Sequence, residues 1–199
     1  MIYLQNDSIQ AHAFQTAKND NIFCGDSFYV SVEEDYFIGV LADGLGSGEL
    51  AYESSQAVVS IVKSNPEADV DTLMHYANEV LIRKRGAAVA ILKVDFKKKT
   101  YEYSCVGNIR FYVYTPSGKL IYPMPVTGYL SGRPMQFRTH KYKYESNSKF
   151  LIHTDGFKNI NTKAFLTSNQ SIPALVARLK VLQQNSKKDD MSFIVGTFL

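Results

Sequence analysis

The chain has 199 residues, of which 45% are hydrophobic and 21% are charged, and its formal net charge is +3. This is the composition of a packed globular protein, and we expect one domain over residues 1–199 with no separate regulatory domain. The 22 basic and 19 acidic residues are too evenly balanced to indicate nucleic acid as a partner. No signal-like N-terminus and no long apolar run is present, so we expect no membrane contact and a cytoplasmic location.

The first part of the chain predicts strands followed by two helices. Apolar runs indicate strands at 10–16, 26–32 and 36–41. Helical periodicity then starts near Leu50 and continues to about Val62. A second helical pattern covers 70–81, with Asp69 or Asp71 as its N-cap.

The second part predicts a run of strands interrupted by one helix. The helix is expected over about 172–183, after Ser171 as N-cap, and the lysine run 97–99 is expected to form a hairpin turn. The strands are expected at 88–96, 100–106, 111–115, 120–124, 136–144, 149–153 and 191–198. Antiparallel-looking runs of strands with inserted helices indicate an α+β fold whose helices cover sheets, and not a doubly wound parallel sheet.

Four acidic clusters stand at the edges of apolar strands, where a side chain is held by a rigid element but faces water. A single Asp-Gly pair usually marks only a turn, but here two such pairs follow apolar runs and an Asp-Asp pair precedes the last strand. From spacing alone, simple turns and a carboxylate metal site remain equally good interpretations. Oxygen ligands of this kind select Mg²⁺ or Mn²⁺ over zinc. The clusters are Cys24-Gly25-Asp26, Ala42-Asp43-Gly44, Thr154-Asp155-Gly156 and Lys187-Lys188-Asp189-Asp190.

The glycine-rich segment 42–49 also allows a different interpretation, as the start of a dinucleotide-binding fingerprint. Glu49 stands at the closing position, where its charge would repel a pyrophosphate. A second helical pattern follows, where that motif requires a strand with a ribose-binding acid. We therefore do not favour a nucleotide site.

Taken in order, the motifs CGDSF, ADGLGSG, HTDGF and KKDDMSF resemble those of the metal-dependent protein phosphatases, the PPM family. The similarity runs from about residue 23 to the C-terminus. It lies with the bacterial branch that acts on anti-sigma and anti-anti-sigma regulators, most of all with the small stressosome phosphatase of the general-stress pathway. The resemblance implies a β-sandwich of two antiparallel sheets flanked by helices, in α/β/β/α layers. It also implies two Mn²⁺ or Mg²⁺ ions and phosphoserine or phosphothreonine substrates on stressosome-type regulators, and we expect a monomer.

The resemblance assigns metal-binding roles by position. Asp43 resembles the carboxylate that bridges two metals, and Gly44 resembles the residue whose backbone carbonyl binds one of them. Asp155 and Asp189 resemble terminal ligands of the other metal. The implied mechanism is attack on phosphorus by a hydroxide that bridges the two metals.

The resemblance also suggests roles for two further acids, and the sequence departs from the family pattern in two respects. Asp26 resembles an acid that reaches the site through a metal-bound water. Asp26 and Asp43 are the expected catalytic residues. Asp190 stands where many relatives have Asn and is a further candidate ligand. Asn108 replaces the aspartate that binds an additional metal in some relatives, and a neutral amide is a poorer ligand for a hard cation, so the sequence leaves a third ion open. No basic residue near Asp26 matches the phosphate-binding arginine of eukaryotic relatives.

Two other functions remain open at this point: a non-catalytic module that binds regulators on the same fold, and a hydrolase of small phosphate esters. Neither Cys24 nor Cys105 lies in a reactive motif, and no Ser–His–Asp set is apparent, so no covalent phosphoenzyme is expected.

Four features have less specific interpretations. His153 is expected to be a buried structural side chain and not the acid that protonates the leaving group. Basic residues 83–85 are expected to begin a strand, either as a solvated corner or as a contact for an acidic partner. Lys187 and Lys188 are candidates for steering a phosphoprotein. Segment 126–135 is either a mobile loop beside the site or a plain connection.

Overall fold

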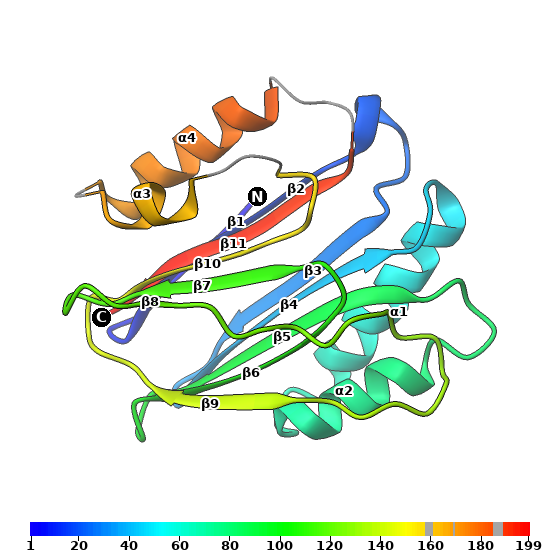
Figure 1. The fold of residues 1–199 in the computed structure, drawn as a ribbon, viewed down its shortest axis with the longest axis horizontal. Helices are drawn as coiled ribbons and strands as arrows, with labels where there is room; N and C mark the ends of the chain where they lie inside the picture. The colour runs from blue at the N-terminus through cyan, green and yellow to red at the C-terminus, as the bar shows by residue number, and fades with distance from the viewer. Residues whose placement is uncertain (158–160, 169, 185–188) are drawn as a thin grey trace.

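Most apolar runs of the sequence become strands, which form two antiparallel sheets that face each other (Figure 1). The computed structural model describes residues 1–157, 161–168, 170–184 and 189–199. The first sheet has six strands in the order β1 (Ile2–Gln5), β2 (Ile9–Thr16), β11 (Met191–Phe198), β10 (Lys149–His153), β7 (Arg110–Tyr114) and β8 (Leu120–Ile121). The second has five, in the order β3 (Asp26–Val32), β4 (Tyr36–Gly44), β5 (Ala87–Asp95), β6 (Thr100–Val106) and β9 (Thr139–Lys143).

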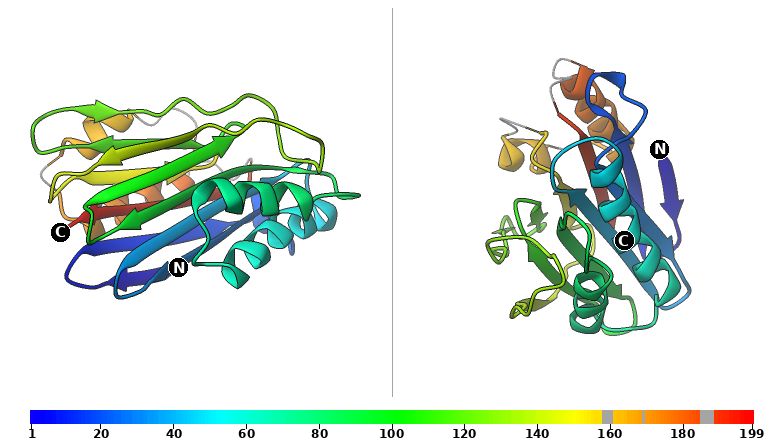
Figure 2. Two further views of the ribbon diagram at one scale, coloured as in Figure 1. Left: turned by 90° about the horizontal axis from the view of Figure 1, so that it is seen from below. Right: turned by 90° about the vertical axis from the view of Figure 1, so that its right-hand side faces the viewer.

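Helices cover the outer face of each sheet, which gives the α/β/β/α layers that the sequence comparison implies (Figure 2). Helices α1 (Glu49–Ser64) and α2 (Val70–Glu79) pack on the second sheet. Helices α3 (Thr162–Leu166) and α4 (Ile172–Gln184) pack on the first, and the short η1 (Lys18–Asp20) follows β2. None of the described helices combines the length and the apolar character needed to cross a membrane.

The interior consists of three apolar layers, because the central strands are buried on both faces. In β5, Ala88, Ala90 and Leu92 point into the space between the sheets, while Val89 and Ile91 pack under α1 and α2. This two-sided burial explains why the sequence of β5 is a nearly continuous apolar run. Aromatic rings fill the middle layer, and the fully buried ones include Phe37, Tyr101, Tyr103, Phe111, Phe150 and Phe198.

The predicted elements agree with the structure where burial gives a strong pattern. The predicted N-cap Asp69 is confirmed, since its carboxylate accepts a 2.7 Å hydrogen bond from the backbone N–H of Thr72. Strand β1 is unpredicted because it is short and mostly exposed, and α3 has too few residues to show helical periodicity. The strands predicted at 120–124 and 136–144 are shorter in the structure, at β8 and β9.

The structure corrects one loop prediction and favours one of the two alternatives for another. Residues 83–85 do not begin a strand but form an exposed turn between α2 and β5. Segment 126–135 is a connection held by several backbone hydrogen bonds. Leu130 exchanges N–H···O bonds of 2.9 and 3.0 Å with Ala87, and the N–H of Val126 donates to the Cys105 carbonyl at 2.9 Å.

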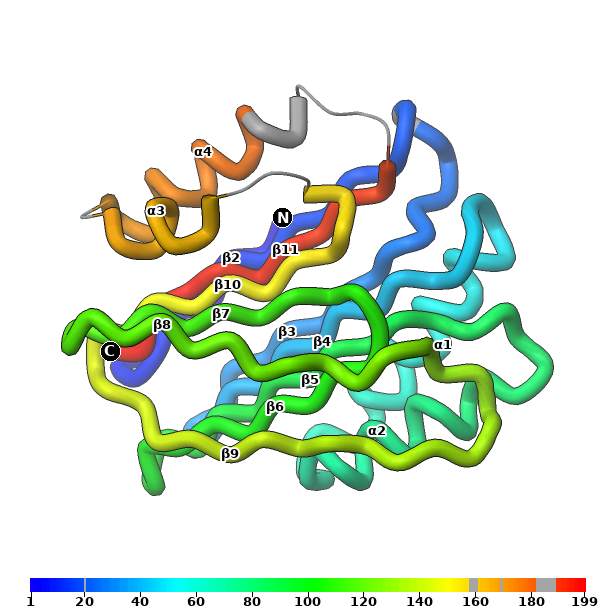
Figure 3. Tube along the Cα trace, viewed as in Figure 1, coloured from blue at the N-terminus to red at the C-terminus, as the bar shows by residue number. Residues whose placement is uncertain are grey.

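The strand directions bring four chain segments to the same end of the sandwich. In Figure 1, β3 begins, β4 ends, β10 ends and β11 begins at the right-hand end. The trace in Figure 3 shows β2, β11 and β10 side by side in the first sheet, as their pairing requires. The aspartates of all four acidic clusters of the sequence lie at these strand ends.

Candidate metal centre

Strand register places Asp26 and Asp43 opposite each other. In the antiparallel pairing of β3 with β4, residue 26 is the partner of residue 43, and Asp43 in turn pairs with Ala88 of β5. Side chains at directly opposed positions have Cβ atoms about 4.5–5.5 Å apart, and like charges there are destabilising. The second sheet therefore contributes two acidic groups that repel each other when both are ionised.

The first sheet brings Asp155 and Asp189 to the same end. Asp155 lies just after β10 and Asp189 just before β11. The turn after Asp155 packs tightly on this second segment, because a Cβ atom added at Gly156 would lie 2.2 Å from the carbonyl oxygen of Asp190. Only glycine allows the two segments to approach so closely.

Asp26 connects the two sheets. Its side chain is 1% exposed, and its Oδ2 accepts a 2.8 Å hydrogen bond from the Thr154 hydroxyl. The backbone of Thr154 is in turn tied to β11, since its N–H donates to the Ser192 carbonyl at 3.0 Å. Burial first, and then the charge of Asp43, raises the pKa of Asp26 well above its ordinary value. Asp26 is thus a buried acid held in place from the opposite sheet.

Asp43 lies at the centre of the acidic group. Burial, followed by the charges of Asp155, Asp189 and Asp190, raises the pKa of Asp43 from 3.8 to about 7. These shifts require that the acids of both sheets lie near one another. The structure therefore brings together the acidic residues that the sequence singled out.

Asp190 has a different surrounding from its neighbour Asp189. Its Oδ1 accepts a 2.8 Å hydrogen bond from the backbone N–H of Lys18, and its Oδ2 accepts one of 2.9 Å from the N–H of Gly25. The carboxylate thereby fixes the connection from β2 to β3. This connection leads directly into Asp26, the first residue of β3. These two bonds favour a structural role for Asp190 over that of a ligand.

Gly44 is required by packing, whatever else its backbone does. A Cβ atom there would lie 1.9 Å from the carbonyl oxygen of Ala51 in α1, so no other residue fits. Its N–H donates a 3.0 Å hydrogen bond to the Gly25 carbonyl, which joins the ends of β3 and β4. Its predicted role as a carbonyl ligand remains a prediction.

The donor set fits hard divalent cations. Asp26, Asp43, Asp155 and Asp189 offer only oxygen atoms, which suit Mg²⁺ and Mn²⁺. Within the described ranges, no Lys, Arg or His nitrogen lies within 4 Å of these carboxylates. Also among the described residues, no three ligand-type side chains already stand together as a formed metal site.

Asn108 contacts the acidic group as a hydrogen-bond donor. Its Nδ2 donates to Asp155 Oδ2 at 2.9 Å, so the amide holds one oxygen of a candidate ligand. This contact, and that of Thr154 with Asp26, were not predicted, although Thr154 lies in the HTDGF motif and Asn108 was singled out as a departure from the family pattern. A pocket of about 360 Å³ opens here, lined by Asp43, Leu45, Ala88, Gly107, Asn108, Thr127, Gly128 and Tyr129.

His153 is buried, as predicted, at 4% exposure. Its Nδ1–H donates a 2.8 Å hydrogen bond to the Thr154 carbonyl, and its ring lies between those of Tyr112 and Phe157. Burial lowers the pKa of His153 to about 4, so the ring is neutral near pH 7. A neutral, enclosed imidazole supports the structural interpretation over that of a leaving-group acid. The candidate steering residues Lys187 and Lys188 lie outside the described residues.

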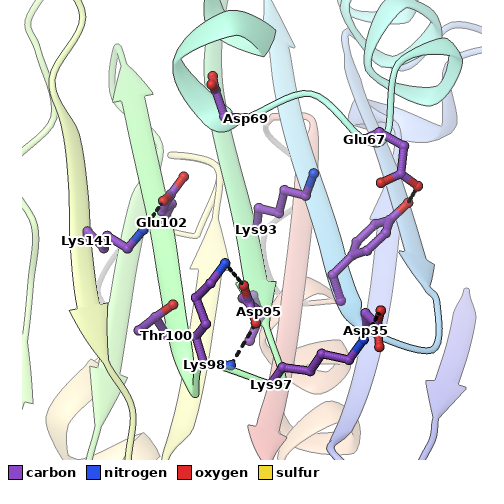
Figure 4. Close-up of a pocket in the computed structure, with 12 residues that line it drawn as sticks. Asp35, Glu67, Asp69, Lys93, Asp95, Lys97, Lys98, Thr100, Glu102 and Lys141 are labelled. Atoms are coloured by element: carbon purple, nitrogen blue, oxygen red, sulfur yellow. Dashed lines mark hydrogen bonds and ion pairs between the residues drawn. The ribbon is translucent and has the colours of Figure 1, made fainter.

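A second pocket, of about 390 Å³, lies at the opposite end of the second sheet (Figure 4). Its charged groups are already engaged with neighbouring protein groups. Lys97, Lys98 and Lys141 form ion pairs with Asp35, Asp95 and Glu102, and Lys93 Nζ donates to the Pro66 and Ala68 carbonyls. Glu67 accepts from the Tyr36 hydroxyl, and Asp69 caps α2. The charged groups of this pocket are therefore engaged in contacts within the protein.

Comparisons with a family model, with known sequences and with solved structures each find proteins similar to this chain. The family model of Stage II sporulation protein E (SpoIIE) matches residues 33–198. The phosphoserine phosphatase RsbX of Bacillus subtilis (strain 168) is 40% identical over 192 residues, which make up 96% of each chain. A crystal structure of RsbX in complex with magnesium superimposes with a TM-score of 0.95 at 39% identity, over 100% of this chain and 99% of that one. The catalytic domain of the serine/threonine phosphatase PstP, in complex with 2 manganese ions, shares the fold at a TM-score of 0.76 and 14% identity, over 96% and 99% of the chains.

The neighbouring acids Asp189 and Asp190 should respond differently to the same change. In metal-free protein, Asp190→Asn places an amide NH₂ against a backbone donor, and we expect it to lower the free energy of unfolding by about 1–3 kcal/mol. Asp189→Asn relieves repulsion and should leave that free energy unchanged or raised. Urea unfolding of both variants in EDTA measures this, and equal destabilisation by the two changes would contradict the roles assigned here.

The raised pKa of Asp43 predicts an unusual pH dependence of stability. Between the unfolded pKa near 4 and the folded pKa of about 7, the folded protein holds more protons than the unfolded chain. The free energy of unfolding of metal-free protein should therefore fall as pH rises through this window. Asp43→Asn removes this contribution and should stabilise the metal-free protein at pH 8 by about 1–3 kcal/mol. Thermal unfolding of both proteins across the window tests this, and a variant that is less stable than the parent at pH 8 would refute it.

Proposed function

The chain belongs to the SpoIIE family of PPM-type phosphatases, and from this membership we propose that it is a metal-dependent phosphatase for phosphoserine and phosphothreonine on a regulator of a bacterial stressosome pathway. The family expected from the four acidic motifs is thereby confirmed. We further propose that residues 1–199 act as one phosphatase domain and as a monomer.

One observation carries the proposal: the acidic groups of two sheets meet at one end and together raise the pKa of Asp43 to about 7. Aspartates that only end strands or form turns have no reason to lie so close together that their charges repel one another. A protein retains an unfavourable charge cluster of this kind chiefly for function. The oxygen donors fit the magnesium and manganese found with RsbX and PstP, and we propose two such ions for this chain.

We propose that Asp43 would be the carboxylate shared by the two ions, and that Asp155, Asp189 and the Gly44 carbonyl would supply further ligands. Divalent metals in such a site generate a nucleophile from water near neutral pH and offset charge on phosphoryl oxygens. Asp26 is buried and held by Thr154, so it can keep a proton or orient a water beside Asp43. Asn108 restrains the orientation of Asp155.

The remaining side chains support direct hydrolysis without a covalent intermediate. Both cysteines are buried and free, and burial raises the pKa of the Cys105 thiol to about 12 and also raises that of Cys24. A reactive cysteine requires a lowered thiol pKa instead. The pocket beside Asp43, which Tyr129 and Asn108 also line, is the proposed seat of the phosphorylated side chain.

Asp43→Asn tests the proposed function. The change preserves side-chain size but removes the central charge, so we expect Mn²⁺-dependent release of phosphate from a phosphoserine protein to fall by about 10³-fold or more. The measurement is phosphate release with excess Mn²⁺, with circular dichroism to confirm folding. The exposed and remote Asp7→Asn serves as the matched control and should retain full activity.

Near-normal phosphate release by Asp43→Asn would contradict the proposal. Comparison of a phosphorylated regulator with a small phosphate ester then separates the alternatives. Preference for the ester would indicate a small-molecule hydrolase. Binding of the regulator without any hydrolysis would indicate a non-catalytic module.

A further inference from the structure

An unpartnered basic turn lies beside the acidic end. Arg83, Lys84 and Arg85 are all exposed and follow one another between α2 and β5. None of them forms an ion pair with any acidic residue that the structure describes. This differs from the lysines of the opposite pocket in Figure 4, each of which already contacts a carboxylate or carbonyl oxygen.

This basic turn is joined to the loop that follows Asp43. The N–H of Leu45 donates a 3.0 Å hydrogen bond to the Gly86 carbonyl, directly after the three cations. The Arg85 guanidinium lies over the same loop, because a Cβ atom added at Gly46 would be 2.6 Å from its Nη1. The turn is therefore held at a fixed place next to the proposed catalytic centre.

The basic turn also forms one wall of a pocket of about 330 Å³. The three cations outnumber the single carboxylate in its lining, which consists of Leu50, Glu53, Ser54, Arg83, Lys84 and Arg85. Leu50 is 50% exposed and the adjacent Ile82 is 57% exposed. A surface that combines unpaired cations with exposed aliphatic side chains is suited to a polypeptide with acidic and apolar residues.

We propose that the basic turn at residues 83–85, with its pocket against α1, docks an acidic segment of the phosphoprotein substrate while the phosphorylated residue enters the pocket beside Asp43. This proposal rests on the proposed phosphatase function. Leu45 belongs to the loop between the two pockets and lines the one beside Asp43, so a single chain can occupy both.

Charge explains why such a surface is useful here. Without metal, the acidic end repels an acidic phosphoprotein, and two divalent ions would do no more than balance the charges of Asp26, Asp43, Asp155 and Asp189. Cations placed beside it attract acidic residues that flank the phosphorylated side chain and raise the rate of productive encounter. The attraction should weaken with added salt, because these cations are exposed.

The test uses two phosphoserine peptides that differ only in one flank, which is rich in Asp and Glu in the first and carries Asn and Gln in the second. The full-length protein with Mn²⁺ should hydrolyse the acidic peptide with a kcat/KM about tenfold higher at low salt. Arg83→Glu/Lys84→Glu should reduce that ratio to about one. The double change Lys63→Glu/Lys143→Glu has the same change of charge at other exposed positions and should keep the preference.

Fluorescence anisotropy of the same labelled peptides gives a readout that does not depend on hydrolysis. If the protein hydrolyses neither peptide, the phosphatase function fails, and the affinity ratio alone still decides whether the basic turn binds acidic peptides. An unchanged ratio in Arg83→Glu/Lys84→Glu, or equal loss in the control, overturns the proposal. Arg85→Glu, checked for folding by circular dichroism, provides a second variant with the same expected direction.

Discussion

Mutual repulsion among acids that lie close together at one end of the sandwich, from the buried Asp26 to the exposed Asp155, is the constraint on which the structure depends. Strand register opposes Asp26 and Asp43, and the ends of β10 and β11 add Asp155 and Asp189. Burial and the proximity of these charges raise the pKa of Asp43 to about 7. The ionised form of Asp43 is therefore less favourable in the folded chain than in the unfolded chain. Divalent cations would relieve that repulsion. Folding stability, pH dependence and metal binding are therefore linked through one group of charges.

The surrounding structure keeps this group in place in spite of the repulsion. The acids stand at the ends of paired strands, whose backbone bonds do not depend on them. Asp190 holds the connection between β2 and β3 through two backbone N–H groups, and Thr154 attaches Asp26 to the opposite sheet. Gly44 and Gly156 permit backbone contacts that no larger residue allows. The same end thus combines an unfavourable charge cluster with a firmly fixed backbone.

The sequence predicts those parts of the fold that carry a strong burial pattern. β3, β6, β10 and β11 match the predicted ranges, because each has apolar residues that are buried or half-buried along its length. β1 and α3 are too short or too exposed to show such a pattern. The acidic motifs indicated the site, since each follows or precedes an apolar strand. The hydrogen bonds of Asp190 and Asn108 were unpredictable, because they join segments whose spatial proximity is set only by the pairing of distant strands.

Electron paramagnetic resonance of the protein titrated with Mn²⁺ tests most directly whether the acidic end binds two ions that share Asp43. Two ions with a common carboxylate are magnetically coupled, so the account predicts a multiline spectrum of an exchange-coupled pair at full occupancy. Asp43→Asn should abolish the coupling. A spectrum of isolated Mn²⁺ ions at every ratio of metal to protein would contradict the account.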